Sequence, residues 1–321
     1  MTLVFGAAGQ DGRLLVHRLL AENRERGQGR VIGVVRPETL ALPDLPCPCV
    51  AVNLADPAAV DGLIAAFKPE RLFYLAAVHH SSDGPSVPDP GLQQAMFTTN
   101  TAGVHGVLAA LKQHAPACRL VYAASSHMYR PGAVNRMVAA GDARDPINYY
   151  GLTKSWAMEA IGFARRHQGL AAGAAVLFNH ESPLRPESFL SRKLSIAAAR
   201  IALGLDREVA VRNIGAFADW FDAEDAVDAI IRLADAGAPG DYAIGAGRLS
   251  GVRDMAAAAF AAVGLDWAQH VSWEADVTRP AVYADIRPAQ DDLKWAPRHS
   301  LSDTMRRMVK ADMARLTSQA R

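Results

Sequence analysis

The sequence has little cysteine, and its three cysteines are poorly placed for structural cross-links. Only one residue separates Cys47 from Cys49, and the third, Cys118, lies far from both. No matching pair of Cys or His residues follows at the spacing of a zinc site. The sequence therefore excludes a disulfide scaffold, and we expect no metal site and free thiols in a reducing compartment.

An excess of charge of either sign is also absent. Lys plus Arg number 34 and Asp plus Glu 33, a net charge of +1. Binding to nucleic acid through its phosphates needs a surplus of positive charge, so no nucleic-acid partner is expected. No apolar run reaches the roughly 18 residues of a membrane span. No basic segment precedes the apolar start, so we expect a cytoplasmic protein with no membrane partner.

Short apolar segments alternate with longer amphipathic segments in the first half of the chain. Strands are expected at 3–5, 31–35, 50–52, 72–75, 120–123 and 174–178. Helices are expected between them at 10–25, 56–67, 100–113 and 149–167. This alternation predicts parallel βαβ units, and the unbroken apolar strands predict a sheet that helices cover on both faces. We therefore predict an α/β fold with a Rossmann-type, doubly wound parallel sheet.

The second half of the chain is less regular. Its expected helices lie at 189–203, 223–236, 252–263 and 301–316, with short strands at 209–211 and 242–244. We predict a Rossmann domain over residues 1–178 and a smaller, mostly helical substrate-binding part over residues 179–321. Some segments of the second part could return to the first domain.

A glycine-rich loop directly follows the first expected strand. Gly6, Gly9 and Gly12 are spaced three residues apart, with Gln10 and Asp11 between the last two. Such a loop lets backbone N–H groups and a helix N-terminus approach a pyrophosphate. The spacing is G-x-x-G-x-x-G rather than the commoner G-x-G-x-x-G. Its place between a strand and a helix nevertheless predicts a dinucleotide site.

The residue after the second expected strand points to the type of dinucleotide. Arg36 occupies a position where a basic side chain suits the 2′-phosphate of NADP and an acidic one suits the ribose of NAD. NADP is therefore the predicted cofactor, and NAD stays open. Further cofactor contacts are expected from Asn53, Leu54, Leu75, Ala76, Ala77, Tyr150, Lys154, Leu177, Asn179 and His180.

A candidate catalytic group combines two segments of the chain. Tyr150 and Lys154 are four residues apart at the start of an expected helix and so share one face. An ammonium beside the phenol would lower the tyrosine pKa and allow proton exchange with a sugar hydroxyl. Ser125, Ser126 and His127 follow the fifth expected strand, at the edge where parallel sheets bind ligands. We therefore expect Ser125 to reach the same substrate oxygen as Tyr150.

The glycine loop with this Ser–Tyr–Lys set resembles the extended short-chain dehydrogenase/reductase family. Further segments resemble its GDP-mannose 4,6-dehydratase branch, above all the run Asn179-His180-Glu181-Ser182-Pro183. The other matching segments are Gly9–Gly12, Phe189–Lys193, Asn213-Ile214, Asp219-Trp220, Asp241-Tyr242, Arg279-Pro280 and Trp295–Pro297. Together they span nearly the whole chain.

The resemblance implies an NADP-dependent reaction on a nucleotide sugar, with a GDP-hexose favoured and the sugar nucleotide bound by the second part of the chain. NADP⁺ would take the C4 hydride, while Tyr150 acts as base at the 4-OH, Ser125 bonds that oxygen and Lys154 tunes Tyr150. A second base would then remove the C5 proton, water would leave from C6, and the hydride would return to C6. The expected substrate contacts are His79, His80, Ser126, Asn179, Arg185, Leu190, Arg192, Lys193, Asn213 and Arg279.

The chain departs from this family at several positions. His127 stands where the dehydratases carry a Glu as the C5 base, and Ala218 stands where they usually have an Arg that contacts the diphosphate. Arg130 stands where Gly is usual. Pro37 occupies the position of a second Arg in a segment that is shorter here, so we expect a homodimer rather than a tetramer.

These departures leave two other functions open. A neutral imidazole at His127 could still remove a proton, but it could equally serve a reductase or epimerase of a 4-keto sugar nucleotide. A non-catalytic dinucleotide-binding sensor is the other alternative. The presence of Ser125, Tyr150 and Lys154 argues against that sensor. The dehydratase is therefore the leading prediction.

Overall fold

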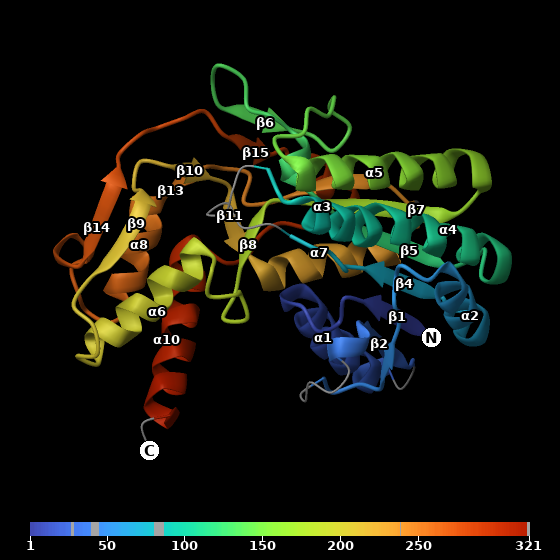
Figure 1. Cartoon of the computed structure of the whole chain (residues 1–321), viewed down its shortest axis with the longest axis horizontal. Coiled ribbons are helices and arrows are strands. Elements are labelled where there is room, and N and C mark those ends of the chain that lie inside the picture. The colour runs from blue at the N-terminus through green and yellow to red at the C-terminus, as the bar shows by residue number, and fades with distance from the viewer. Residues whose placement is uncertain (27–28, 40–44, 80–86, 238, 320–321) are drawn as a thin grey trace.

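The computed structural model of the chain describes residues 1–26, 29–39, 45–79, 87–237 and 239–319. Over these residues no helix is both long and apolar enough to cross a bilayer. The elements divide between a large parallel sheet with its covering helices and a smaller helical unit beside it (Figure 1).

Seven strands form the central parallel sheet within the described residues, in the order β12-β7-β5-β4-β1-β2-β3. The strands of this sheet are β1 Thr2–Phe5, β2 Val31–Val35, β3 Cys49–Ala51, β4 Arg71–Tyr74, β5 Arg119–Ser125, β7 Ala171–Leu177 and β12 Asp241–Ile244. Every residue of β1 and β2 is buried, as a sheet covered on both faces requires. The predicted Rossmann-type α/β fold is confirmed.

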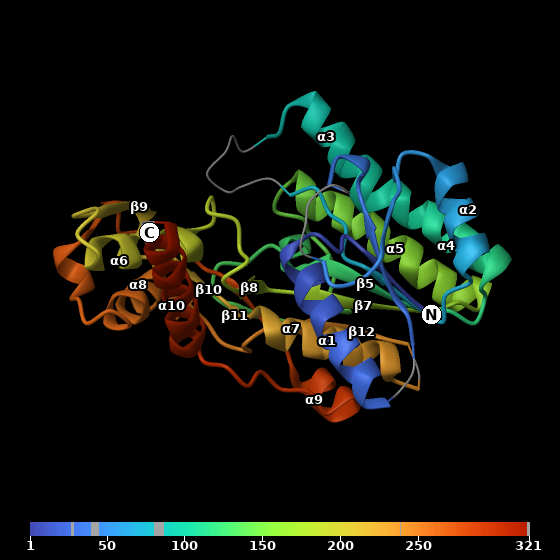
Figure 2. The ribbon, with the colours of Figure 1, turned by 90° about the horizontal axis from the view of Figure 1, so that it is seen from below.

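Helices cover both faces of this sheet (Figure 2). On one face lie α1 (Gln10–Arg26), α7 (Ala223–Asp235) and α9 (Arg287–Leu293). On the other lie α2 (Pro57–Phe67), α3 (Pro90–Phe97), α4 (Gly103–His114) and α5 (Tyr149–Gln168). Asp56 caps α2 as expected, since its side chain accepts from the backbone N–H groups of Ala58 and Ala59. The helix expected to begin at residue 100 begins at Gly103, after a π-helical turn, η2 (Thr98–Ala102).

The smaller unit has an apolar core of its own. Three helices, α6 (Leu190–Ala202), α8 (Val252–Ala261) and α10 (Leu301–Gln319), pack around Leu194, Phe260 and Met305. The parallel pair β9 (Val209–Asn213) and β14 (Val271–Ala275) lies beside them, with η4 (Trp267–Gln269) before β14.

Two short strand pairs and one returning segment tie the two units together. The strand β8 (Asn179–Glu181) leaves the main sheet after β7 and pairs with β11 (Trp220–Asp222). The chain then returns, because α7 packs on the main sheet and β12 completes its edge beside β7. Two further strand pairs and two turns complete the described elements. The pairs are β6 (Arg136–Val138) with β15 (Val282–Ala284) and β10 (Phe217–Ala218) with β13 (Ser250–Gly251), and the turns are η1 (Pro37–Thr39) and η3 (Ser126–Met128).

A buried ion pair joins α6 to α10 in the smaller unit. The side chains of Arg192 and Asp312 are 2% and 1% exposed, and the guanidinium of Arg192 bonds the Asp312 carboxylate. The second oxygen of that carboxylate accepts a hydrogen bond of 2.7 Å from Ser195 Oγ. Each charge is therefore compensated inside the core, and removing one partner would leave the other buried without a counter-charge.

We expect Asp312→Asn to lower the free energy of unfolding by about 3–5 kcal/mol, because it leaves the buried Arg192 guanidinium without its counter-charge. Denaturant unfolding of both proteins measures the difference. Asp303→Asn on the exposed first turn of the same helix is the control and should cost less than about 1 kcal/mol. Equal costs for the two substitutions would contradict this account.

Candidate active site

A cavity of ≈ 510 Å³ opens at the carboxyl ends of β1, β2 and β4. Eight residues predicted to contact the cofactor line it, namely Gly6, Gly9, Arg36, Asn53, Leu54, Leu75, Ala76 and Ala77. Sequence reasoning missed other lining residues, among them Glu38, Val78 and Thr99. The cavity thus lies at the edge of the sheet where a doubly wound fold binds its ligands.

The glycine loop is shaped by very close backbone approaches. Gly6 has φ +82°, and a Cβ there would lie 2.6 Å from the backbone nitrogen of Ala76. A Cβ on Gly12 would lie 2.2 Å from the carbonyl oxygen of Gly6. Gly9 is less crowded and lines the cavity just before α1 begins at Gln10. This cradle at a helix N-terminus fits the pyrophosphate of a dinucleotide.

Hydrogen bonds tie the start of α1 to β8 and the turn after it. The Gln10 amide donates to the carbonyl oxygen of His180 at 3.2 Å and accepts from Ser182 Oγ at 2.8 Å. The His180 ring has its Nε2 2.9 Å from Asp11 Oδ2 and its Nδ1 2.7 Å from the carbonyl oxygen of Phe178. Two sequence segments, separated by some 170 positions, therefore form one network beside the glycine loop.

The Asp11–His180 pair is charged in the folded state. Burial by itself raises the pKa of Asp11, but the His180 charge and hydrogen bond and the Gln10 amide lower it to about 2. Burial likewise opposes the imidazolium of His180, yet the Asp11 carboxylate raises its pKa overall. Both His180 nitrogens face oxygen acceptors, so the doubly protonated ring satisfies both contacts.

The candidate catalytic residues meet at the end of β5 and the first turns of α5. The Ser125 hydroxyl lies close enough to the phenol of Tyr150 to favour its ionised form, and it accepts from the backbone N–H of His127 at 3.2 Å. The Lys154 ammonium donates to the carbonyl oxygen of Ala123 at 2.8 Å and lies 5.7 Å from the centre of the Tyr150 ring. The structure thus brings together three of the residues that the sequence analysis selected.

The pKa of the phenol differs from the expectation of a lowered value. Burial raises the pKa of Tyr150 to about 12, although the charge of Arg185 and the hydrogen bond from Ser125 both favour the tyrosinate. Burial also lowers the pKa of Lys154 to about 7. In this enclosed cluster desolvation outweighs the contacts that favour the charged forms of Tyr150 and Lys154.

A ring of aromatic and basic side chains surrounds Tyr150. The His79 ring lies edge-on to it, 4.7 Å away between centres, and is 5.4 Å from the Phe189 ring and 5.9 Å from the His127 ring. The Arg185 guanidinium lies 3.8 Å from the centre of the Phe189 ring. Two of these residues, His79 and Arg185, were predicted to contact the substrate, and they lie beside the catalytic cluster. The predicted contact His80 lies outside the described residues.

Other residues predicted to contact the substrate are bonded to other groups of the protein or are exposed to solvent. Arg192 is held by Asp312 in the smaller unit, and Lys193 and Arg279 are exposed. The Asn213 amide fixes the loop that precedes Arg279, since it donates to the carbonyl oxygen of Val277 at 2.8 Å and accepts from its backbone N–H at 2.9 Å. The remaining predicted residues are buried or half-buried, namely Ser126 after β5, Leu177 and Asn179 at the end of β7 and the start of β8, and Leu190 at the start of α6.

Two asparagines near the catalytic group were missed. Asn100, fully buried in the π-helical turn, donates to Thr153 Oγ1 at 3.1 Å and bonds both backbone groups of Val78. Asn148 caps α5 and contacts the His127 ring. An Asn just before a helix is a capping signal that could have identified the second. Asn100 was expected as the first residue of a helix, and nothing in the sequence signals its bonds to Val78 and Thr153.

The sheet, the glycine loop and the Ser–Tyr–Lys cluster define an enzyme of the extended short-chain dehydrogenase/reductase class. The family model described as GDP-mannose 4,6 dehydratase matches residues 3–308, and the chain belongs to this family. The resemblance noted in the sequence is therefore confirmed.

Individual relatives agree with this assignment. GDP-mannose 4,6 dehydratase 1 of Arabidopsis thaliana is 28% identical over 98% of this chain and 90% of its own length. UDP-glucose 4-epimerase of Thermotoga maritima has a TM-score of 0.79 at 21% identity, with 99% of each chain covered. The NADPH complex of RMD from Pseudomonas aeruginosa has a TM-score of 0.76 at 19% identity, covering 98% of this chain and 99% of that one. At these identities the two structures show a shared fold.

The charged Asp11–His180 pair predicts a pH-dependent stability. The contribution from Asp11, whose pKa is lowered, is present above its unfolded pKa near 3.8 and is lost as the pH falls through about 2. The contribution from His180, whose pKa is raised, is present below its unfolded pKa near 6.5 and is lost as the pH rises through its folded pKa. Full stabilisation therefore falls between about pH 4 and pH 6.5.

We expect Asp11→Asn to lower the free energy of unfolding by about 2 kcal/mol at pH 6 and by less at pH 9, because the attraction to Asp11 weakens as the pH rises through the raised pKa of His180. Denaturant titrations of both proteins at the two pH values give the comparison. Asp266→Asn, at the exposed cap of η4, serves as control and should show no such difference. A cost for Asp11→Asn that is the same at both pH values would rule out a charged pair.

Proposed function

We propose that this protein is an NADP-dependent enzyme that acts at C4 of the hexose in a GDP-sugar and catalyses its 4,6-dehydration. The observation that carries the proposal is the Ser125–Tyr150–Lys154 cluster beside a cavity shaped for a dinucleotide, in a chain of the GDP-mannose 4,6 dehydratase family. Relatives whose names specify nucleotide-sugar substrates support the substrate class. The family supports GDP-mannose as the first sugar to test.

The preference for NADP rests on Arg36. Its exposed side chain follows β2 and lines the cavity, where a guanidinium would pair with a 2′-phosphate. The glycine loop would hold the pyrophosphate at the start of α1. Bound NADP would supply the hydride acceptor and donor for the sugar carbon.

The proton transfer at C4 falls to the chain's own side chains. Tyr150 takes the proton of the C4 hydroxyl, and Ser125 donates a hydrogen bond to the same oxygen. Lys154, fixed by the carbonyl oxygen of Ala123, favours the tyrosinate while it carries its charge. Because burial holds the Tyr150 pKa near 12, this transfer needs the charges of Lys154 and Arg185 to offset desolvation.

A second candidate is reduction or epimerisation of a 4-keto sugar nucleotide. The observation that favours it is the imidazole of His127, at the position where the dehydratases carry a carboxylate base. Tyr150 and Lys154 serve dehydration and reduction equally well, since both involve hydride transfer at C4. A non-catalytic sensor would have no need of Ser125 beside the phenol of Tyr150.

Incubation of the NADP-loaded enzyme with GDP-mannose separates the two candidates. A dehydratase forms a 4-keto-6-deoxy product with no net change in NADPH, and Tyr150→Phe should lower its rate by about 10²-fold or more, because the proton acceptor is lost. Product detection by NMR and NADPH absorbance provide the readouts. NADPH oxidation only on addition of a 4-keto sugar would overturn the dehydratase in favour of the second candidate. Full activity in Tyr150→Phe would overturn both.

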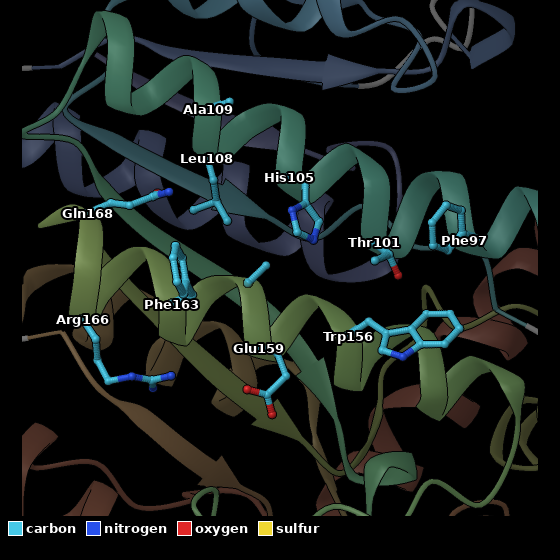
Figure 3. A pocket seen from close by; sticks show the side chains of 11 residues that line it. Phe97, Thr101, His105, Leu108, Ala109, Trp156, Glu159, Phe163, Arg166 and Gln168 are labelled. Atoms are coloured by element: carbon cyan, nitrogen blue, oxygen red, sulfur yellow. The ribbon is translucent and has the colours of Figure 1, made fainter.

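We also propose that the protein is a homodimer, assembled through an apolar groove between α4 and α5. The groove, of ≈ 680 Å³, lies away from the catalytic cluster and is lined by Phe97, Leu108, Trp156 and Phe163 among others (Figure 3). Phe97, Trp156 and Phe163 are 39%, 41% and 52% exposed. Large apolar side chains grouped in this way favour burial against a second copy.

The Phe163→Glu substitution should convert the dimer to a monomer, because it places a charge in the proposed apolar interface. Light scattering coupled to size-exclusion chromatography measures the mass directly. Trp273→Glu on β14 is a matched control, since this residue is 44% exposed and lies in the other unit. A monomeric parent protein, or a dimer that survives Phe163→Glu but not Trp273→Glu, would refute this interface.

A further inference from the structure

The turn that follows β5 and the cap of α5 are joined through one pair of side chains. Asn148 Nδ2 lies 3.1 Å from Nδ1 of His127. His127 belongs to η3, directly after Ser125, and Asn148 is the N-cap of the helix that carries Tyr150. The pair therefore links the two segments that supply the catalytic hydroxyls.

The orientation of the Asn148 amide is fixed by its other hydrogen bond. The backbone N–H of Gly151 donates to Asn148 Oδ1 at 2.8 Å, the usual bond of an N-cap side chain. A backbone N–H can only donate, so the amide atom facing Gly151 must be the oxygen. The amide atom that faces His127 is consequently the NH2 group, which has protons to donate and no lone pair to offer.

That orientation determines where His127 carries its proton. Because Asn148 donates to Nδ1, this nitrogen must keep its lone pair, and the single proton of a neutral imidazole stays on Nε2. A proton on Nδ1 would place two N–H groups against each other. Burial, together with the charge of Arg185, lowers the pKa of His127 and keeps the ring neutral. Its other ring neighbours are His79 and Tyr150.

The free nitrogen belongs to the catalytic cluster. The His127 ring is perpendicular to the Tyr150 ring at 5.7 Å between centres, and its own backbone is anchored at both ends. Its N–H donates to Ser125 Oγ, and its carbonyl oxygen accepts from the backbone N–H of Ile147 at 3.1 Å. Nε2 has no hydrogen-bond partner in the part of the chain that the structure describes.

We propose that Asn148 is a positioning residue that holds His127 as its Nε2–H tautomer, so that His127 donates a hydrogen bond to an oxygen of the bound sugar. This inference rests on the proposed action on a nucleotide sugar. It assigns His127 a role different from that of the carboxylate in the dehydratases, because Nε2–H has no lone pair with which to take the C5 proton. The role suits the second candidate function directly, whereas dehydration would need another proton acceptor.

The tautomer can be read without any substrate. In NADP-loaded protein labelled with ¹⁵N-histidine, at pH 7, His127 should show a pyridine-type shift at Nδ1 and a pyrrole-type shift at Nε2. The His127→Phe variant identifies the two signals by their loss among ten histidines. A pyrrole-type Nδ1, or an imidazolium pattern at both nitrogens, would overturn the proposal.

Two substitutions of Asn148 keep the helix cap while changing what faces the ring. Asn148→Asp replaces the donor by a carboxylate acceptor, so the proton should move to Nδ1 and the two ¹⁵N patterns should interchange or become those of an imidazolium. Asn148→Ser keeps a capping oxygen but no longer presents an amide donor, so both tautomers should contribute and the two shifts should approach each other. Unchanged shifts in both variants would show that Asn148 does not set the tautomer.

Activity measurements on the same proteins keep this inference separate from the proposed function. With a reactive sugar nucleotide, Asn148→Asp with interchanged ¹⁵N patterns should raise KM for the sugar by about 10-fold, since Nε2 then has no proton to donate, while NADP affinity stays unchanged. Unchanged KM alongside interchanged ¹⁵N patterns would overturn the contact with sugar. If the unsubstituted protein shows the proposed His127 tautomer but turns over no nucleotide sugar, the proposed function is wrong.

Discussion

The geometry of the active site depends on one close contact, that between the first turn of α5 and the turn that follows β5. A Cβ on Gly151 would lie 2.1 Å from the carbonyl oxygen of His127, so only glycine allows this approach. With α5 seated there, the phenol of Tyr150 meets Ser125 and the Asn148 amide meets the His127 ring. A larger residue at position 151 would push the helix away and break both contacts together.

A second constraint joins the cofactor end of the fold to the unit beyond the sheet. The chain leaves the sheet through β8, and His180 in that strand pairs with Asp11 at the start of α1. Gln10 and Ser182 add two more hydrogen bonds across the same junction. The glycines of the glycine loop therefore shape the cradle, while their neighbours Gln10 and Asp11 hold β8 and the turn after it in place.

The sequence predicted those features that rest on local chemistry and on the topology of parallel sheets. The apolar runs placed the strands, and the rule that strand ends gather at one edge brought Ser125 and Tyr150 together. Arg192 shows where such reasoning stops, because its partner Asp312 lies 120 positions away on another helix. Asn213 is similar, since its partner Val277 follows a different strand. A basic or amide side chain in a family motif does not reveal whether its hydrogen bonds are already taken within the fold.

The two histidines best fixed by hydrogen bonds near the active site show how the partner atoms, rather than the residue type, decide the chemistry. His180 faces a carbonyl oxygen at Nδ1 and a carboxylate at Nε2, so both nitrogens hold protons and the ring is charged. His127 faces an amide donor at Nδ1 and is buried near the Arg185 charge, so it is neutral with its proton on Nε2. Replacing a glutamate by histidine at position 127 therefore changes more than the strength of a base. It exchanges a group that accepts protons for one whose Nε2–H donates a hydrogen bond, and Asn148 keeps it in that form.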